Sequence, residues 1–142
     1  MKRVIAMMVS AIIALNGFSQ KNFKDLIGRW EIMDQQGSNA TLEIIDTSSI
    51  LLSYNGEKKK IIDYKIDFTK SPIWFDFSTS DTSSVVTVKS ILEILNDNMI
   101  KWQLFVDEER TPHFSSTKGE MFYLRKAKPV INTGVVTTDI HL

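Results

Sequence analysis

Apolar and polar residues alternate with a period of two through most of this chain. In residues 59–68 (KKIIDYKIDF), every second residue from 62 to 68 is apolar and the residues between them are charged. This period is typical of a β-strand with one buried face. The same kind of pattern marks strands at 29–34, 40–46, 49–55, 73–78, 85–95, 99–106 and 120–126. The sequence therefore predicts eight short strands and no long helix.

Turn-forming residues separate these segments, which favours an antiparallel meander. The turn signals are Gln36–Asn39, Asp46–Ser48, Asn55–Glu57, Lys70–Pro72 and Asn96–Asn98. Asn55-Gly56 suits a tight hairpin because both residues tolerate positive φ. Before the first strand, Phe23 and Leu26 would share one face of a short helical turn that Gly28 ends. Eight strands joined in this way predict an all-β fold, a single antiparallel barrel.

The chain of 142 residues is long enough for one domain. Residues 1–19 have the pattern of a secretory signal peptide: Lys2 and Arg3, an apolar run over 4–15, then small residues at 17 and 19. The alternative is an uncleaved N-terminal anchor. We expect a barrel domain over 20–126, a C-terminal tail over 127–142, and export to the periplasm or beyond the cell without a stable membrane anchor. In the tail, GVVTT could add an edge strand.

Composition excludes several functional classes. Lys plus Arg equals Asp plus Glu, 17 each, which offers no field for nucleic acid. The chain has no cysteine, hence no disulfide, thiolate nucleophile or lipidated cysteine. Its two histidines, His113 and His141, lack metal-ligand spacing. We expect no metal and no cofactor, and the basic run 58–60 is interpreted as a solvated hairpin end.

Several weak motifs in a fixed order resemble a known family. LIGRW (26–30) is similar to the glycine-x-tryptophan motif of lipocalins. The other matching segments are YKIDFTKSPIWFDF (64–77), ILEILNDNMIKWQL (91–104), ERTPHFSS (109–116) and Leu124-Arg125. Together they resemble an uncharacterised bacterial lipocalin-like domain family, common in planctomycetes and Bacteroidetes, whose first strand carries leucine-x-glycine-x-tryptophan. The match covers about Leu26 to Lys126.

This resemblance implies an eight-stranded, calycin-type barrel with a structural motif at its closed end. In lipocalins the first-strand tryptophan packs against an arginine near the last strand. Carried over, these residues are Gly28, Trp30 and Arg125. The resemblance departs at Ser90, where the family has a glycine, so it does not settle whether the strand bends there. It implies no particular ligand.

Strand parity predicts which side chains face the barrel interior. An eight-stranded barrel is either filled by side chains or holds one small ligand, and the sequence leaves both open. In the second case the candidate ligand-binding residues are Leu42, Ile44, Leu52, Tyr64, Phe75, Phe77, Leu92, Trp102 and Leu104. A continuous cavity bordered by Tyr64 and Trp102 would favour ligand binding.

Three functional hypotheses follow. The first is a non-enzymatic binding protein for a small apolar or amphipathic ligand. The alternative is a protein-interaction module, such as a barrel-type inhibitor or an envelope assembly factor, with a filled core. Its support would be an exposed apolar patch of Trp74, Val85, Ile91 and Phe105.

The third hypothesis is a hydrolase or isomerase that uses Glu109 and His113. It lacks a nucleophile and an orienting partner, so we expect no enzyme and no catalytic residues. The same stretch contains Arg110, which we expect to pair with Asp107 or Glu108 or to serve as the arginine that the family has before its proline.

Overall fold

The computed structural model describes residues 21–33, 39–54, 56–81 and 83–129. The expected signal peptide, the turn residues 36–38, His141 and the tail from residue 130 onward lie outside these ranges. Within them the chain forms one short helix and eight strands. The elements are α1 (Phe23–Leu26), β1 (Gly28–Ile32), β2 (Ala40–Asp46), β3 (Ser49–Tyr54), β4 (Glu57–Asp67), β5 (Ile73–Asp81), β6 (Ser84–Asn96), β7 (Met99–Phe105) and β8 (Glu120–Lys126).

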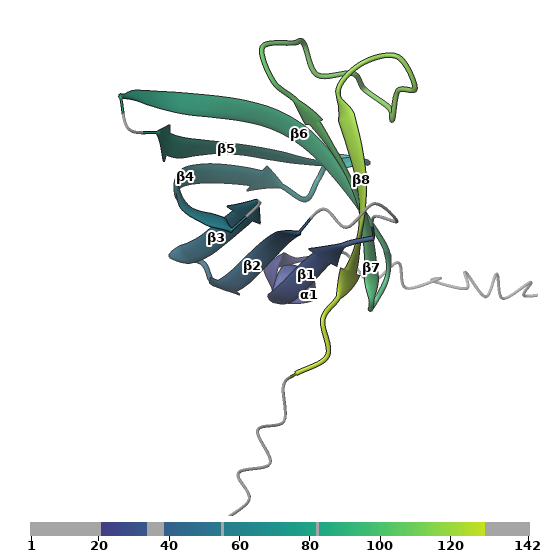
Figure 1. Ribbon diagram of the computed structural model, residues 1–142. Helices are drawn as coiled ribbons and strands as arrows, with labels where there is room; N and C mark the ends of the chain where they lie inside the picture. Colours follow the sequence, from purple (N-terminus) through teal and green to yellow (C-terminus); the bar gives the residue numbers. More distant parts are fainter. Residues whose placement is uncertain (1–20, 34–38, 55, 82, 130–142) are drawn as a thin grey trace, which may run out of the picture.

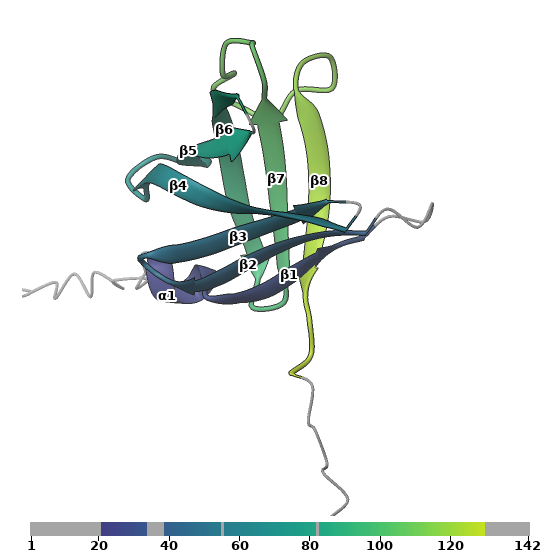
Figure 2. The ribbon, with the colours of Figure 1, turned by 60° about the vertical axis from the view of Figure 1, so that its left-hand side comes forward.

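The eight strands form a closed antiparallel barrel in which each strand pairs with its neighbours in sequence. The predicted fold class is confirmed. The strands of the first half, β1 to β3, cross those of the second half, β6 to β8, at a steep angle (Figure 2). β4 and β5 connect the two halves, and α1 lies beside the end of the barrel where β2 turns into β3 (Figures 1 and 2).

The barrel closes where β1 meets β8. Only three residue pairs form this ladder: Trp30 with Lys126, Glu31 with Arg125, and Ile32 with Leu124. A backbone hydrogen bond extends it at each end, from Met33 N to the Tyr123 carbonyl at 2.8 Å and from Ala127 N to the Arg29 carbonyl at 2.8 Å. Closure pairs β1 on both of its edges and covers the second half of β8, residues 124–126.

The up-and-down topology gives the barrel two different ends. One end, here called the closed end, carries the β2–β3 and β6–β7 turns, the loop 68–72 and α1. The opposite end, here called the open end, carries the β1–β2, β3–β4 and β5–β6 connections and the long loop 106–119. This assignment decides which inward-facing residues lie near solvent.

Two aspartates at the closed end stabilise their own turns. Asp46 accepts hydrogen bonds from the hydroxyl and the backbone N–H of Ser48, both at 2.8 Å, and Asp67 accepts the same pair from Thr69. These hydrogen bonds lower the pKa of both carboxyl groups, and the bond from the hydroxyl has the largest effect. Because the folded-state pKa is lowered, the associated stability is present above the unfolded pKa and is lost as pH falls through the folded pKa. Both groups are exposed, so the contribution is small.

The segment LIGRW is one packed unit at the closed end. Leu26 and Trp30 are fully buried, and the Trp30 indole Nε1–H donates to the Leu26 carbonyl at 2.8 Å. Gly28 between them has φ of 139°, a conformation that side-chain-bearing residues rarely adopt. The expected helical turn is confirmed as α1, with Leu26 in the core and Phe23 packed against it. The unit therefore fixes the start of β1 to the base of the barrel.

Aromatic rings fill the closed half of the barrel around Phe75. Its ring centroid lies 5.3 Å from that of Phe77, 5.7 Å from that of Trp102 and 6.3 Å from that of Tyr64. Tyr64 stacks in turn on Phe23 of α1, with centroids 6.3 Å apart. Such offset and edge-on pairs add to the free energy gained by burying the rings.

The cation beside Trp30 is not the one expected. Lys126 Nζ lies 5.3 Å from the centroid of the indole ring, whereas Arg125 is exposed. The reason is strand parity: Lys126 is directly opposite Trp30 and shares its face, while Arg125 is opposite Glu31 on the outer face. The predicted partnership of Trp30 with Arg125 is therefore wrong by one residue.

Replacing Trp30 tests its role at the closed end. We expect Trp30→Ala to lower the free energy of unfolding by about 3–5 kcal/mol, because a fully buried indole leaves a cavity. Trp30→Phe keeps an aromatic ring but loses the hydrogen bond to Leu26, so it should lower the free energy of unfolding by less. Urea denaturation measures both. A Trp30→Ala protein within about 1 kcal/mol of wild type would contradict this structural role.

Candidate functional site

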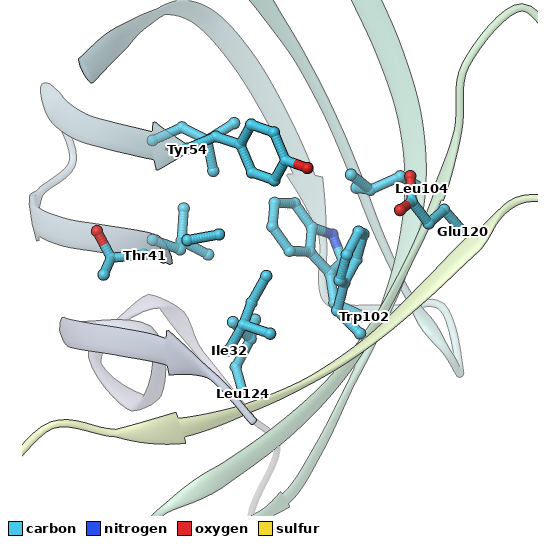
Figure 3. A pocket seen from close by; sticks show the side chains of 11 residues that line it. Ile32, Thr41, Tyr54, Trp102, Leu104, Glu120 and Leu124 are labelled. Carbon is cyan, nitrogen blue, oxygen red and sulfur yellow. The ribbon is translucent and has the colours of Figure 1, made fainter. Parts of the chain in front are cut away.

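A cavity of about 340 Å³ opens at the open end of the barrel, between β1, β2, β3, β7 and β8. Four of the predicted interior residues line it: Leu42, Leu52, Trp102 and Leu104. Its other lining residues, which the sequence reasoning did not single out, are Ile32, Ala40, Thr41, Tyr54, Glu120, Phe122 and Leu124. Figure 3 shows lining side chains such as Ile32, Tyr54 and Trp102 around this space, whereas Thr41 is turned away from it.

The remaining predicted interior residues fill the core instead. Ile44, Phe75, Phe77 and Leu92 are buried and do not line the cavity. Tyr64 lies at the closed end, where its hydroxyl donates to the Thr47 carbonyl. The cavity is thus bordered by Trp102 but not by Tyr64, so the arrangement that would favour ligand binding is present only in part. The barrel is filled in its closed half and hollow in its open half.

Trp102 forms the boundary between these two halves. Its ring packs on Phe75 and Phe77 on the filled side, with centroids 5.7 Å apart in both cases. Its indole Nε1–H donates to the Ser90 hydroxyl at 2.8 Å. The hydrogen bond and the ring contacts hold the indole in one orientation, so it gives the cavity a flat apolar floor.

Ser90 explains how this orientation is held. Its fully buried hydroxyl accepts the Trp102 hydrogen bond and donates to the Phe75 carbonyl. The β5–β6 ladder pairs Trp74 with Ile91 and Phe77 with Val88, and Ser90 supplies its hydrogen bond between these pairs. A glycine at this position would leave the indole N–H without this acceptor, and an unsatisfied buried donor is costly.

Polar groups gather at the mouth of the cavity. Tyr54, at the end of β3, is 58% exposed, and Glu120, the first residue of β8, is exposed. Figure 3 shows the Tyr54 hydroxyl and the Glu120 carboxylate turned toward one another across the mouth. Lys59 lies opposite Leu52 in the β3–β4 ladder, does not line the cavity and interacts with another group of the chain.

A second hollow of about 250 Å³ continues from the mouth along the rim. It shares Ile32, Tyr54, Glu120 and Phe122 with the cavity, and adds Met33, Met121 and Tyr123. A ligand with its body in the cavity can therefore extend a head group over the rim.

Most of the outer apolar patch that would support a protein-interaction module is not exposed. Ile91 and Phe105 are buried and Trp74 is half-buried, whereas Val85 is 62% exposed. The long β7–β8 loop, residues 106–119, lies against two of these residues. Arg110 packs on the Trp74 ring, and Gly119 lies beside the Phe105 ring.

Gln103 fastens this loop to the outer face of β7. Its side-chain amide donates to the carbonyls of Ser115 at 2.7 Å and Lys118 at 2.6 Å, and its carbonyl accepts from Ser115 N at 2.9 Å. The loop ends at Gly119, where φ is 68° and an added Cβ would lie 2.6 Å from the Leu104 carbonyl oxygen. Both features require the loop to lie close against the strand.

Arg110 makes the second attachment of the loop. Its guanidinium carbon lies 3.8 Å from the centroid of the Trp74 ring, and its nitrogens bind both carboxylate oxygens of Asp76. Of the two roles considered for Arg110, pairing with Asp107 or Glu108 is therefore wrong. Those two residues are exposed, and Glu108 accepts from the Gly119 backbone N–H at 2.9 Å. A residue in β5 outcompetes near neighbours because its carboxylate meets the flat guanidinium with both oxygens.

Glu109 and His113 are exposed on the same loop. Within the described ranges no hydrogen bond or ion pair joins them. The same ranges contain no cluster of three or more metal-binding side chains. No helix among the described residues has the length and apolar character needed to cross a membrane.

Comparisons with protein-family models, with curated proteins and with solved structures find no match.

Arg110→Met tests the attachment of the loop. We expect it to lower the free energy of unfolding by about 1.5–3 kcal/mol, because Asp76 loses a charge-assisted partner in a partly buried site. Amide hydrogen exchange over residues 106–119 should become faster. The matched control is Lys70→Met. Lys70 Nζ also lies over the Trp74 ring, 4.8 Å from its centroid, but Lys70 is exposed. Equal effects of both variants would show that Arg110 does not hold the loop.

Proposed function

We propose that this protein binds a small apolar or amphipathic ligand in the open half of its barrel. The observation that carries the proposal is the cavity of about 340 Å³ between β1, β2, β3, β7 and β8. Its volume lies within the range of small-molecule sites, and apolar side chains dominate its lining. Binding would remove water from Ile32, Leu52, Leu104 and Phe122, which are all partly exposed.

The filled closed half supports this function by keeping the cavity in shape. Trp102 is held by Ser90 and by two phenylalanine rings, so the floor does not need to form when a ligand enters. A preformed site loses less conformational entropy on binding than one that must be ordered.

The proposal also covers the family of the protein and its export. A closed eight-stranded barrel with LIGRW packed at its closed end is compatible with the resemblance drawn from the sequence. We propose that the protein is an exported lipocalin-like binding protein. The alternative of a protein-interaction module loses its main support, because Ile91 and Phe105 are covered.

Filling the cavity tests the proposed function. Ala40 lies in its wall and is 8% exposed, so Ala40→Phe would place a ring in the space that a ligand needs. We expect wild type to bind N-phenyl-1-naphthylamine, a neutral apolar dye, with increased fluorescence. The variant should bind it at least about tenfold more weakly, a difference of about 1.4 kcal/mol.

The control is Ile62→Phe, which adds a ring to a residue of β4 that is 52% exposed. It should bind the dye as wild type does. Thermal unfolding confirms that both variants fold. If wild type does not bind the dye, or if Ala40→Phe binds it unchanged, the cavity is not a ligand site.

A further inference from the structure

We propose that the head group of the ligand is cationic, so that the natural cargo is an amphiphile with an apolar body and one protonated amine. This inference rests on the proposed function and adds a chemical class to it. It comes from the unequal distribution of charge around the mouth of the cavity.

Glu120 is placed to meet such a head group. It lies opposite Leu104 in the β7–β8 ladder and lines both the cavity and the rim hollow. Among the described residues that line these two spaces, none is basic and Glu120 alone is acidic. Among the lining residues that the structure describes, a bound head group would therefore meet one carboxylate and no lysine or arginine.

The Glu120 carboxylate also has no partner of its own in the described part of the chain. Some other carboxylates are engaged: Asp76 binds Arg110, Glu108 accepts from Gly119, and Asp46 holds its own turn. An ionised carboxylate only accepts hydrogen bonds, so Glu120 favours a head group that donates them.

Tyr54 completes the arrangement. Its hydroxyl faces the Glu120 carboxylate across the mouth, directly above the apolar walls (Figure 3). An ammonium group has three N–H donors, and the carboxylate, the phenol oxygen and water can each accept one. A carboxylate head group would instead face Glu120 with like charge, which selects against anionic amphiphiles such as fatty acids.

The test compares three compounds of equal chain length and different head group: decylammonium, 1-decanol and decanoate. Each is used to displace the neutral dye from wild type at pH 7 and low salt. We expect decylammonium to bind at least about fivefold more tightly than decanoate, because the carboxylate attracts the ammonium group and repels the carboxylate. The preference is limited because the site is partly exposed and its charge is partly screened. The preference should shrink at 0.5 M NaCl.

Two variants assign the preference to its residue. Glu120→Gln should reduce the ratio of the two affinities to about one and leave decanol binding unchanged. Glu109→Gln removes the same charge from the exposed loop, away from the two hollows, and should keep the wild-type ratio.

Equal or tighter binding of decanoate to wild type would overturn the inference, and this comparison needs no variant to fold. Persistence of the preference in Glu120→Gln would overturn it as well. If the dye binds but the three head groups do not differ, the proposed function stands and the cationic head group is wrong. If neither the dye nor any of the three compounds binds, the proposed function itself fails and the inference fails with it.

Discussion

Closure of the sheet between β1 and β8 is the constraint on which the rest of this molecule depends. The ladder has only three residue pairs, so β1 needs anchoring beyond its own backbone bonds. LIGRW supplies it: Trp30 is buried in the core and bonds back to the Leu26 carbonyl, while Leu26 belongs to α1 beneath the barrel. Lys126, across the seam, covers the indole. Without closure both halves of the cavity wall, β1 to β3 and β7 to β8, would separate.

The interior is divided at Trp102 into a part that stabilises the fold and a part available to a ligand. Below it, aromatic rings around Phe75 bury most of the apolar surface of the closed half. Above it, small or partly exposed side chains such as Ala40 and Leu52 leave the space open. The loop 106–119 removes the outer apolar residues from solvent through Gln103 and Arg110. Ile91 and Phe105 are thereby buried, while the cavity at the open end keeps a partly exposed apolar lining.

Strand positions and the facing of most side chains could be predicted because a period of two leaves a direct record of the buried face. Leu42, Leu52, Trp102 and Leu104 were assigned to the interior on that basis. The irregularity in β4 between Ile61 and Asp63 breaks this period, so Ile61 is buried and Ile62 is exposed. The height of a residue along the barrel could not be predicted, because it depends on register and strand tilt. Tyr64 was therefore included among the ligand-binding residues, whereas Tyr54, which lines the cavity, was not. The partnership of Arg125 with Trp30 came from the family resemblance, and Lys126, the next residue, holds that position. Contacts such as Arg110 with Asp76 join residues 34 apart, and local sequence contains no signal for them.

The ligand site inside the barrel is tested most directly by a ¹H–¹⁵N NMR titration with the neutral dye, in which the indole N–H signals of the three tryptophans are followed. Trp102 lies at the floor of the cavity, Trp30 at the closed end and Trp74 on the outer face under Arg110. We expect the Trp102 signal to shift on titration while those of Trp30 and Trp74 stay in place. A saturable shift at Trp74 with none at Trp102 would locate binding on the outer face and contradict a ligand site inside the barrel.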